Sequence, residues 1–342
     1  MPTEPKTILI TGGAGFIGST VGSALIDAGY QVVVLDNLST GREEFCTDRK
    51  LYVGDIADGQ LIDRIVADNP GISAVVHCAA SIVVPESVAE PIRYYNNNVV
   101  GTLKLVESLL RNGITRMLFS SSASIYGVAE DFTVDENSPI DPSSPYARTK
   151  AHVEGMLADI CDGTDLRLIS LRYFNPIGAD PKMRTGLALE KPSHALGMIL
   201  TRDAEGEPFT VTGDTWPTRD GSGVRDYIHV WDLAAAHVAA IDNFDSVVTG
   251  PDGDCTHRAI NLGTGTGTTV FELVEAYNRV VGHEIAVEVG PPRPGDVAGA
   301  YAQTGRAEKE LGWRATHSVD DGIRDTLRWF DRRGDILPDL AR

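Results

Sequence analysis

Short apolar runs recur along the first half of the chain, and a stretch with helical spacing follows each of them. The first run, 7–11, leads through a glycine cluster into a helical pattern that extends to about Ala28. Five further runs lie at 31–36, 50–55, 74–80, 116–122 and 166–174. Apolar strands that alternate with helices are typical of a parallel sheet covered on both faces. The pattern therefore predicts a doubly wound α/β fold.

Further along, the pattern loosens into loops that carry Pro and Gly, before helical spacing returns at about 230–243 and 270–281. A length of 342 residues suits about two domains. We therefore expect a first domain over 1–175, to which the chain returns near 228–262, and a smaller C-terminal α/β domain over 176–342.

The charge balance limits the class of partner. The chain has 30 Lys and Arg against 48 Asp and Glu, a formal net charge of −18. Such an acidic surface argues against a protein that binds nucleic acid or an anionic membrane. Any anionic ligand must therefore be held by local cations.

Cysteine and histidine spacing predicts neither a disulfide framework nor a metal site. The four cysteines, at 46, 78, 161 and 255, lie far apart, and the eight histidines show no ligand-like spacing. Residues 1–6 are polar and lack the apolar core of a signal peptide, and no apolar run approaches the ~18 residues that span a bilayer. These features predict a cytoplasmic protein without a membrane segment.

Three glycines directly after the first strand form the first chemical motif. Gly12, Gly15 and Gly18 open the next helix, where missing side chains let a pyrophosphate approach the helix N-terminus. Glycine spacing alone is weak, because a turn can use it merely to tighten packing. Asp36 strengthens the motif: it ends the second strand, where a carboxylate binds both hydroxyls of an adenosine ribose and repels a 2′-phosphate. The motif predicts a Rossmann-type domain that binds NAD rather than NADP.

A second glycine cluster, at 261–269, also follows a strand and precedes a helix. Too few residues remain after it for another complete βαβ unit. We therefore expect a turn and a helix cap there.

Tyr146 and Lys150 form the second motif. Pro145 suits the first turn of a helix with Ser144 as its cap, and the four-residue spacing then places phenol and ammonium on one face. Such pairs are common on solvated helices, but Ser122 ends a predicted parallel strand, where ligands of open α/β sheets bind. A nearby cation lowers a tyrosine pKa towards the range of a general base. Together the three side chains predict an alcohol–ketone redox site beside a nicotinamide.

Eight segments between residues 11 and 296 extend these motifs in order, and the similarity that they carry runs from about residue 6 to about residue 335. They read TGGAGFIG, HCAAS, NNNVVGT, FSSSASIYG, SPYARTK, RYFNPIGA, GVRDYIHVWDLA and PRPGD. With them the chain resembles the extended short-chain dehydrogenase/reductase superfamily and, within it, the UDP-galactose (UDP-glucose) 4-epimerases. RYFNPIGA and GVRDYIHV are far more specific than the glycines.

The resemblance implies an NAD-dependent isomerase of carbohydrate metabolism that inverts carbon 4 of a UDP-hexose. Tyr146 would remove the proton of the 4-hydroxyl while a hydride passes to NAD, and Ser122 would bind the same oxygen. The 4-keto sugar would then turn and take the hydride back on its other face. Lys150 would hold the nicotinamide ribose and lower the pKa of Tyr146. Relatives form homodimers through two helices, here at roughly 92–110 and 145–160.

The resemblance also carries over binding residues. The three glycines, Tyr146 and Lys150 belong to the cofactor side. The resemblance adds to it Phe16, Ile17, Asp36, Asn37, Asp55, Ile56, Ala79, Ala80, Asn98, Ser120 and Tyr173. The UDP-sugar side comprises Ser122, Tyr146, Asn175, Thr210, Thr212, Arg225, Arg293, Asp296 and Ala300. The two arginines suit a diphosphate, because a guanidinium binds oxyanions through two hydrogen bonds.

Three departures from the family pattern matter. Residues 81–84 read SIVV where many relatives have a lysine that reaches the cofactor, which leaves a weaker clamp and dissociable NAD open. Ser193 and His194 replace an Asn-Asn pair that contacts the sugar nucleotide in relatives, and we expect His194 to be a loop residue and His229 to be structural. Ala300 falls where restrictive members have a tyrosine, so it predicts turnover of UDP-N-acetylglucosamine and UDP-N-acetylgalactosamine as well.

Other functions stay open. A 4-epimerase of UDP-glucuronate or of a UDP-pentose would need few changed contacts. A nucleotide-sugar 4,6-dehydratase shares the tyrosine and lysine, but relatives of that class have an Asp-Glu pair where this chain has Ser122 and Ala123. A non-catalytic NAD sensor would be expected to have lost Tyr146 or Lys150, and both are present.

Overall fold

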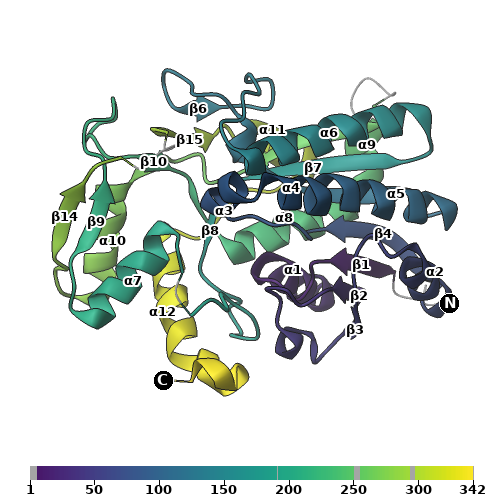
Figure 1. The fold of residues 1–342 in the computed structure, drawn as a ribbon, viewed down its shortest axis with the longest axis horizontal. Coiled ribbons are helices and arrows are strands. Elements are labelled where there is room, and N and C mark those ends of the chain that lie inside the picture. The colour runs from purple at the N-terminus through teal and green to yellow at the C-terminus, as the bar shows by residue number, and fades with distance from the viewer. Residues whose placement is uncertain (1–5, 191, 250–254, 293–296, 342) are drawn as a thin grey trace.

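A seven-stranded parallel sheet forms the centre of the computed structural model, which describes residues 6–190, 192–249, 255–292 and 297–341 (Figure 1). Its strand order is β12-β7-β5-β4-β1-β2-β3. The strands are β1 (Thr7–Thr11), β2 (Gln31–Asp36), β3 (Lys50–Val53), β4 (Ile72–His77), β5 (Arg116–Ser122), β7 (Arg167–Tyr173) and β12 (His257–Leu262). The first six of them are the apolar runs predicted from the sequence.

Helices cover both faces of this sheet, because alternate strand residues point to opposite sides. In β1, Ile8 and Ile10 pack into the core on one face, and Leu9 packs into the core on the other. The first face carries α1 (Phe16–Asp27), α8 (Val230–Asp242), α9 (Phe244–Thr249) and α11 (Gly305–Leu311), and the second carries α2 (Gly59–Asp68), α5 (Gly101–Arg111) and α6 (Pro145–Gly163). The predicted doubly wound, Rossmann-type α/β fold is confirmed.

The winding of the sheet reverses beside β1. The chain builds outward from β1 to β3 and then resumes at β4, on the other side of β1. In open α/β sheets the crevice outside the carboxyl ends of the strands at such a switch binds ligands. The ends of β1, β2, β4, β5 and β7 are therefore the places where ligand-binding residues are expected.

Helical segments also make up most of the connection from β4 to β5. They are α3 (Val84–Ala89), α4 (Pro91–Tyr94), a π-helical stretch (Tyr95–Val100) and α5. Short 3-10 turns lie at Glu43–Cys46, Ala123–Ile125 and Pro338–Leu340.

A smaller region follows residue 175, although α8, α9, α11 and β12 return to the large sheet. It holds α7 (Ala195–Glu205), α10 (Val270–Val281) and α12 (Val319–Ile336), and its core contains the fully buried Trp329. Its strand pairs are β9 (Phe209–Thr212) with β14 (Val287–Gly290) and β8 (Asn175–Ile177) with β11 (Tyr227–His229). A third sheet has the order β13 (Thr268–Thr269), β10 (Val224–Arg225), β15 (Gly299–Ala302) and β6 (Thr133–Val134), and β6 joins it from the earlier part of the chain. The division of the chain into domains near residue 175 stays a prediction.

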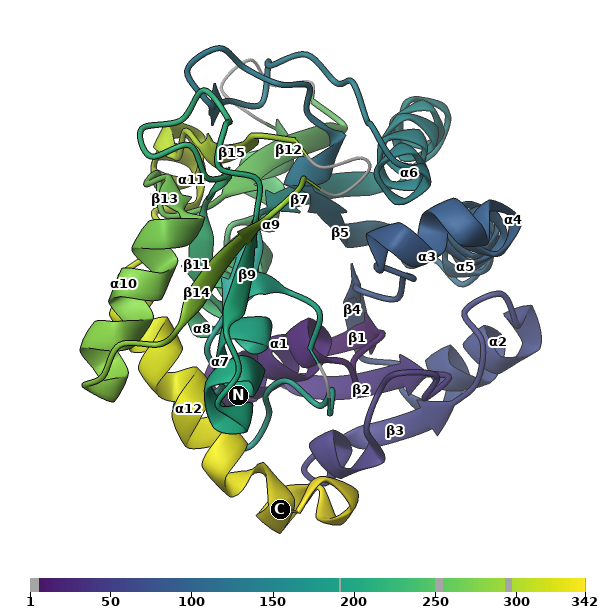
Figure 2. The ribbon, with the colours of Figure 1, turned by 60° about the vertical axis from the view of Figure 1, so that its left-hand side comes forward.

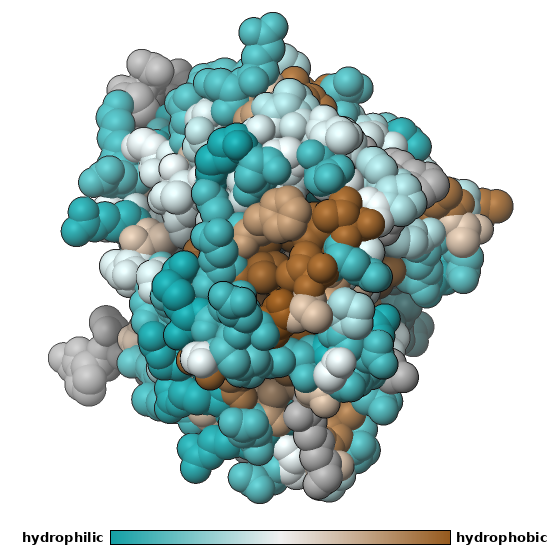
Figure 3. All heavy atoms as spheres, turned by 90° about the vertical axis from the view of Figure 1, so that its left-hand side faces the viewer, coloured by the Kyte–Doolittle hydropathy of each residue, from teal (hydrophilic) through white to brown (hydrophobic). Residues whose placement is uncertain are grey.

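The smaller region lies to one side of the large sheet. In Figure 2, α7, α10, α12 and the β9–β14 pair lie on the left, and α2, α5 and α6 lie on the right. The face at the left of Figure 1 has apolar side chains near its centre with mostly polar ones around them (Figure 3). Within the described ranges, no helix combines the length and the apolar character needed to span a bilayer.

Candidate active site

The glycine turn after β1 lies against the loop that follows β4. Gly12 has a φ of +71°, in the left-handed region, and a Cβ there would come within 2.6 Å of the Ala79 amide nitrogen. A Cβ on Gly18 would lie 2.3 Å from the Gly12 carbonyl oxygen, so α1 packs directly on the turn. Gly15 is the N-cap of α1 and has no side chain to cap the first amides of the helix. The turn is therefore shaped to bring an anion such as pyrophosphate to these amides.

Asp36 ends β2 beside this turn. One carboxylate oxygen accepts the Ala14 amide at 3.0 Å, and the other accepts the Leu38 amide at 2.8 Å. Asp36 is 7% exposed, and burial raises the pKa of its carboxyl. Because a carboxylate can accept about four hydrogen bonds, places remain for the hydroxyls of a ribose.

The other predicted cofactor positions differ in burial. Phe16, Ile17, Ala79 and Ala80 are half-buried, and Asn37 and Asp55 are exposed. Ile56 is buried and packs into the core beside β2, so a contact with adenine would have to come from its backbone. Contact between these residues and a cofactor stays a prediction.

Asn98 joins the loop after β4 to α6. It lies in the π-helical stretch, a rare conformation that is frequent at functional sites, and it is 3% exposed. Its side-chain amide donates to the Ser81 carbonyl oxygen and the Thr149 hydroxyl, both at 3.0 Å, and its side-chain oxygen accepts the Ser81 amide at 2.8 Å. Asn98 therefore fixes the start of the segment 81–84. Ile82, which replaces the expected lysine, is 61% exposed.

Tyr146 lies in the first turn of α6. Ser144 caps this helix by accepting the Ala147 amide at 3.2 Å, with Pro145 at the first helical position, as the sequence predicts. The half-buried Tyr146 forms a hydrogen bond through its hydroxyl with Ser122 at the end of β5. The structure thus brings together the predicted base and the predicted hydroxyl partner.

Lys150 lies one turn further along α6 and is 4% exposed. Its ammonium donates to the Ser120 carbonyl oxygen at 2.7 Å and lies 4.9 Å from the centre of the Phe119 ring. Burial lowers the pKa of Lys150 to about 8, while Cys78 and Glu154 act in the opposite direction. The ammonium therefore loses its proton only slightly above neutral pH.

The expected lowering of the Tyr146 pKa by Lys150 is not found in this structure. Burial raises the pKa of Tyr146, and the hydrogen bond with Ser122 is the cause that opposes it. The reason is geometric, because the Lys150 ammonium is directed at the Ser120 carbonyl oxygen. Ser122 is therefore the side chain that acts on the phenol.

Ser120 and Tyr173 join the ends of β4, β5 and β7. The Ser120 hydroxyl donates to the Cys78 sulfur at 3.1 Å. Burial raises the pKa of Tyr173 well above its usual range, and a hydrogen bond with Ser120 opposes this effect. The predicted residues Ser120 and Tyr173 thus meet at one edge of the sheet, together with Cys78, which the sequence reasoning did not single out.

Arg225 and Ala300 are neighbours in the smaller region, paired in register on β10 and β15. The Arg225 guanidinium donates to the carbonyl oxygens of Val224, Ala298 and Val297 at 2.7, 3.0 and 3.2 Å. It therefore lies along the segment that leads into β15. Ala300 is half-buried and packs against the cluster that contains Tyr126.

Asp226, which the sequence reasoning missed, ties the strands of this region together. Its fully buried carboxylate accepts the Thr264 amide and hydroxyl at 2.8 and 2.7 Å and the amides of Gly265 and Ala302 at 3.2 Å. Its carbonyl oxygen accepts the Asn175 amide at 3.0 Å. Asp226 therefore fixes Arg225, Asn175 and Ala300 relative to one another. The sequence signal that could have indicated Asp226 is a carboxylate within the partly apolar segment 224–230.

The remaining substrate positions are less defined. Thr210 and Thr212 lie on β9, which pairs with β14, and the Thr210 hydroxyl donates to Glu288 at 2.7 Å. Their place beside a uracil stays a prediction. Arg293 and Asp296 lie outside the described residues.

Comparison with known proteins shows which family the chain belongs to. Residues 8–263 match the model of the NAD dependent epimerase/dehydratase family, which is more than half of the chain. The chain belongs to this family. The resemblance read from the sequence motifs is thereby confirmed.

Members of the NAD dependent epimerase/dehydratase family resemble the chain over nearly its full length. The UDP-glucose 4-epimerase of Bacillus subtilis is 40% identical over 333 residues, which cover 94% of this chain and 96% of that protein. The UDP-glucose-4-epimerase of Stenotrophomonas maltophila, solved with NAD and formylated UDP-arabinopyranose, has a TM-score of 0.89 at 35% identity, covering 98% and 100% of the two chains. That of Bifidobacterium longum, in complex with NAD+ and UDP, has a TM-score of 0.87 at 36% identity with the same coverage.

Several residues outside the candidate site act as helix caps. Thr269 and Glu272 form a capping box at the start of α10, so the prediction of a helix cap after the second glycine cluster is confirmed. His194 and His229 each accept a first-turn amide, of α7 at 3.2 Å and of α8 at 3.0 Å. These contacts account for both histidines as structural residues.

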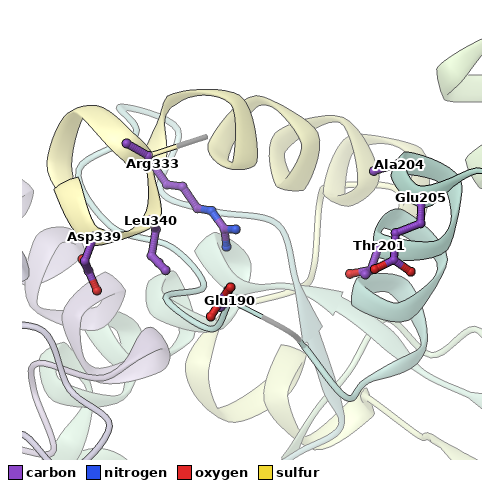
Figure 4. A pocket seen from close by; sticks show the side chains of 8 residues that line it. Glu190, Thr201, Ala204, Glu205, Arg333, Asp339 and Leu340 are labelled. Carbon is purple, nitrogen blue, oxygen red and sulfur yellow. The ribbon is translucent and has the colours of Figure 1, made fainter.

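Two cavities lie away from the candidate active site. One, of 260 Å³, lies beside the C-terminal helix, where Arg333 extends from α12 towards Glu190 (Figure 4). The other, of 460 Å³, lies between α6 and the outer strands β7 and β12. Tyr146 and Ser122 are absent from both linings. Among the described residues no group of three His, Cys, Asp or Glu side chains is placed to hold a metal ion.

Proposed function

We propose that this family member is a UDP-glucose 4-epimerase, an isomerase that interconverts UDP-glucose and UDP-galactose with bound NAD. The observation that carries the proposal is the hydrogen-bonded pair of Tyr146 and Ser122 beside the buried Lys150, at the sheet edge that holds the glycine turn. Relatives of this name, 40% identical over nearly the whole chain, support the choice of substrate.

The residues present fit NAD. Gly12, Gly15 and Gly18 leave space for a pyrophosphate at the N-terminus of α1. The buried Asp36 carboxylate offers acceptors to the adenosine ribose and would repel a 2′-phosphate. When bound, NAD supplies the group that takes a hydride from carbon 4 of the sugar and gives it back.

The chain's own residues manage the proton and the orientation of the sugar. Tyr146 must act as the phenolate: in that form it is the general base that accepts the proton of the 4-hydroxyl and returns it in the second half of the reaction. Burial raises the pKa of its phenol, and the positive charge of a nicotinamide bound beside it would lower that pKa again. Ser122 donates a hydrogen bond to the same sugar oxygen, and Lys150 binds the nicotinamide ribose. The 4-keto sugar turns about its link to UDP between the two half-reactions, so carbon 4 is inverted.

On the substrate side, Arg225 and Arg293 are assigned to the diphosphate of UDP. Asn175 and Asp296 are assigned to the sugar nucleotide, with Thr210 and Thr212 beside the uracil. The fixed register of the Arg225 and Ala300 strands supports a compact site in which the sugar lies near Ala300.

Ala300 governs the acceptance of N-acetylated sugars in this proposal. Wild-type protein is expected to turn over UDP-N-acetylglucosamine and UDP-N-acetylgalactosamine. Ala300→Tyr is expected to keep UDP-glucose turnover and to lower kcat/KM for the N-acetylated pair by about tenfold or more, because a phenol fills the space of the acetamido group. Assays of both substrate pairs check this, with Ala300→Ser as a control of similar size. Absence of N-acetyl turnover by the wild type would refute the argument.

One experiment tests the function as a whole. Pure protein, with and without added NAD, is incubated with each UDP-hexose, UDP-glucuronate and a UDP-pentose, and the product isomers are followed. We expect UDP-glucose and UDP-galactose to equilibrate. Turnover of the glucuronate or pentose alone, loss of water, or bound NAD without any turnover would assign the chain to the corresponding alternative. A requirement for added NAD would show that the change at 81–84 makes the cofactor dissociable.

We also propose that the protein is a cytoplasmic homodimer that pairs through α4–α5 and α6. Ile92 and Val100 support this pairing as apolar side chains that are 77% and 46% exposed on the first of these helical segments. The four cysteines are free thiols, which suits a reducing compartment. Sedimentation equilibrium would test the dimer.

A further inference from the structure

Three consecutive residues at the end of β5 meet three residues of α6 that lie one helical turn apart. Residues 146, 150 and 154 share one face of the helix through their i, i+4 spacing. The contacts are those of Ser122 with Tyr146, of the Ser120 carbonyl oxygen with Lys150 at 2.7 Å, and of the Ser121 hydroxyl with Glu154. The first two belong to the proposed reaction, and the third lies directly beside them.

Glu154 is held in a buried ion pair. Its side chain is 10% exposed and that of Arg172 is 6% exposed. The guanidinium donates to both carboxylate oxygens at 2.6 to 3.1 Å, and it also donates to the Tyr126 hydroxyl at 3.0 Å. A buried charge needs such partners, and the Ser121 hydroxyl adds one more. The position of the carboxylate is therefore fixed.

This carboxylate acts on Lys150 from the next turn of the same helix. Burial lowers the pKa of Lys150 to about 8, and Glu154 and Cys78 oppose this shift. Burial raises the pKa of the Cys78 thiol to about 11, so the thiol carries no charge near pH 8. His77 is neutral as well, because burial lowers its pKa to about 3. Glu154 therefore supplies the negative charge that favours the ammonium.

The other two arginines near Glu154 have carboxylate partners of their own. The cavity of 460 Å³ between α6 and the strands β7 and β12 has Glu154, Arg172, Arg258, Arg306 and His257 in its lining. Of these, Arg258 pairs with Glu310, and Arg306 lies 3.5 Å from Glu136. These pairings leave Arg172 as the guanidinium that meets Glu154 directly.

We propose that Glu154 is a positioning residue that keeps Lys150 charged and in place where the nicotinamide ribose binds. The inference rests on the proposed NAD-dependent function. A neutral lysine has fewer donors and no charge, so it holds ribose hydroxyls less firmly. Glu154 thus extends the span of pH over which the cofactor is held.

Glu154→Gln tests the charge, because the amide oxygen still accepts from Ser121 and Arg172. As the pH rises through the pKa of Lys150, the ammonium loses its proton and NAD affinity falls; without the carboxylate this fall begins at lower pH. We expect the NAD dissociation constant of the variant to exceed that of the wild type about three- to tenfold at pH 8.5 and to agree within about twofold at pH 6.5. Calorimetry on nucleotide-free protein measures both.

A second variant separates positioning from folding. Glu154→Gln leaves Arg172 buried without its full counter-charge, which lowers stability, whereas Glu154→Gln with Arg172→Gln leaves a neutral pair. The pH shift in the single variant, with a smaller shift in the double variant because loss of the Arg172 charge offsets loss of the Glu154 charge, supports the proposal. No shift in a folded single variant overturns it.

Two further comparisons isolate the inference. Glu308→Gln, which changes an exposed carboxylate on α11, is expected to bind NAD as the wild type does at both pH values. A wild type that binds NAD and epimerises no UDP-sugar would sink the proposed function while leaving the binding test of Glu154 valid.

Discussion

Tyr146→Phe is expected to abolish most epimerisation and to leave UDP-sugar binding intact. The change removes one hydroxyl and keeps the ring in the first turn of α6, where Ser144 caps the helix. Loss of a positioned general base typically costs about 10²- to 10⁴-fold, so we expect kcat for UDP-galactose to fall by that factor. Turnover assays combined with calorimetry of UDP-glucose binding measure both halves of the expectation.

A matched control is Tyr52→Phe. Its hydroxyl donates to Asp68 at 2.8 Å near the surface of β3, away from the ends of β4 and β5. This variant should epimerise as the wild type does. Near wild-type turnover by Tyr146→Phe would remove Tyr146 from the reaction, whereas loss of both turnover and binding would point to a damaged fold.

The large sheet and its glycine turn could be predicted because their signals are local. The strands β1, β2, β4, β5 and β7 are short apolar runs that are mostly buried on both faces, whereas the residues of the edge strand β3 are exposed or half-buried. Gly12 needs its left-handed φ within the turn itself. The cap at Ser144 and the capping box at Thr269 likewise depend on residues a few positions apart. Such features follow from the periodicity and the chemistry of one segment.

The direction of the Lys150 side chain could not be predicted in the same way. The i, i+4 spacing places Lys150 and Tyr146 on one helix face, but the Ser120 carbonyl oxygen, 30 positions away, decides where the ammonium points. The expected effect of Lys150 on the phenol was wrong for this reason. Packing between α6 and β5 determines the contact of Lys150 with the Ser120 carbonyl oxygen, and residue spacing along the helix does not predict it.

Asp226 and Glu154 were missed for a related reason. Each is a buried carboxylate whose partners come from distant segments: Ala302 is 76 positions from Asp226, and Ser121 is 33 positions from Glu154. Charged residues in a sequence usually indicate an exposed face. Only the arrangement of donors around them shows that these two are interior residues that fix the site.

The acidic surface makes local cations decisive for the substrate. With a net charge of −18, the overall field repels a nucleotide diphosphate. Binding must then come from side chains such as Arg225, whose guanidinium lies along the segment leading to β15 and next to Ala300 in register. Its carbonyl contacts hold it in that place before any ligand arrives.

Arg225→Gln is therefore expected to weaken UDP-glucose binding about ten- to a hundredfold, because a hydrogen bond to a charged group contributes about 1.5 to 3 kcal/mol. Arg225→Lys should restore only part of this affinity, since an ammonium cannot form the paired hydrogen bonds of a guanidinium. Calorimetry of UDP binding measures each variant, with Arg314→Gln, an exposed position between α11 and α12, as the control. Unchanged affinity in Arg225→Gln would mean that the diphosphate is bound elsewhere. An equal loss in Arg225→Gln and in Arg314→Gln would indicate an effect of the overall charge instead of a local contact.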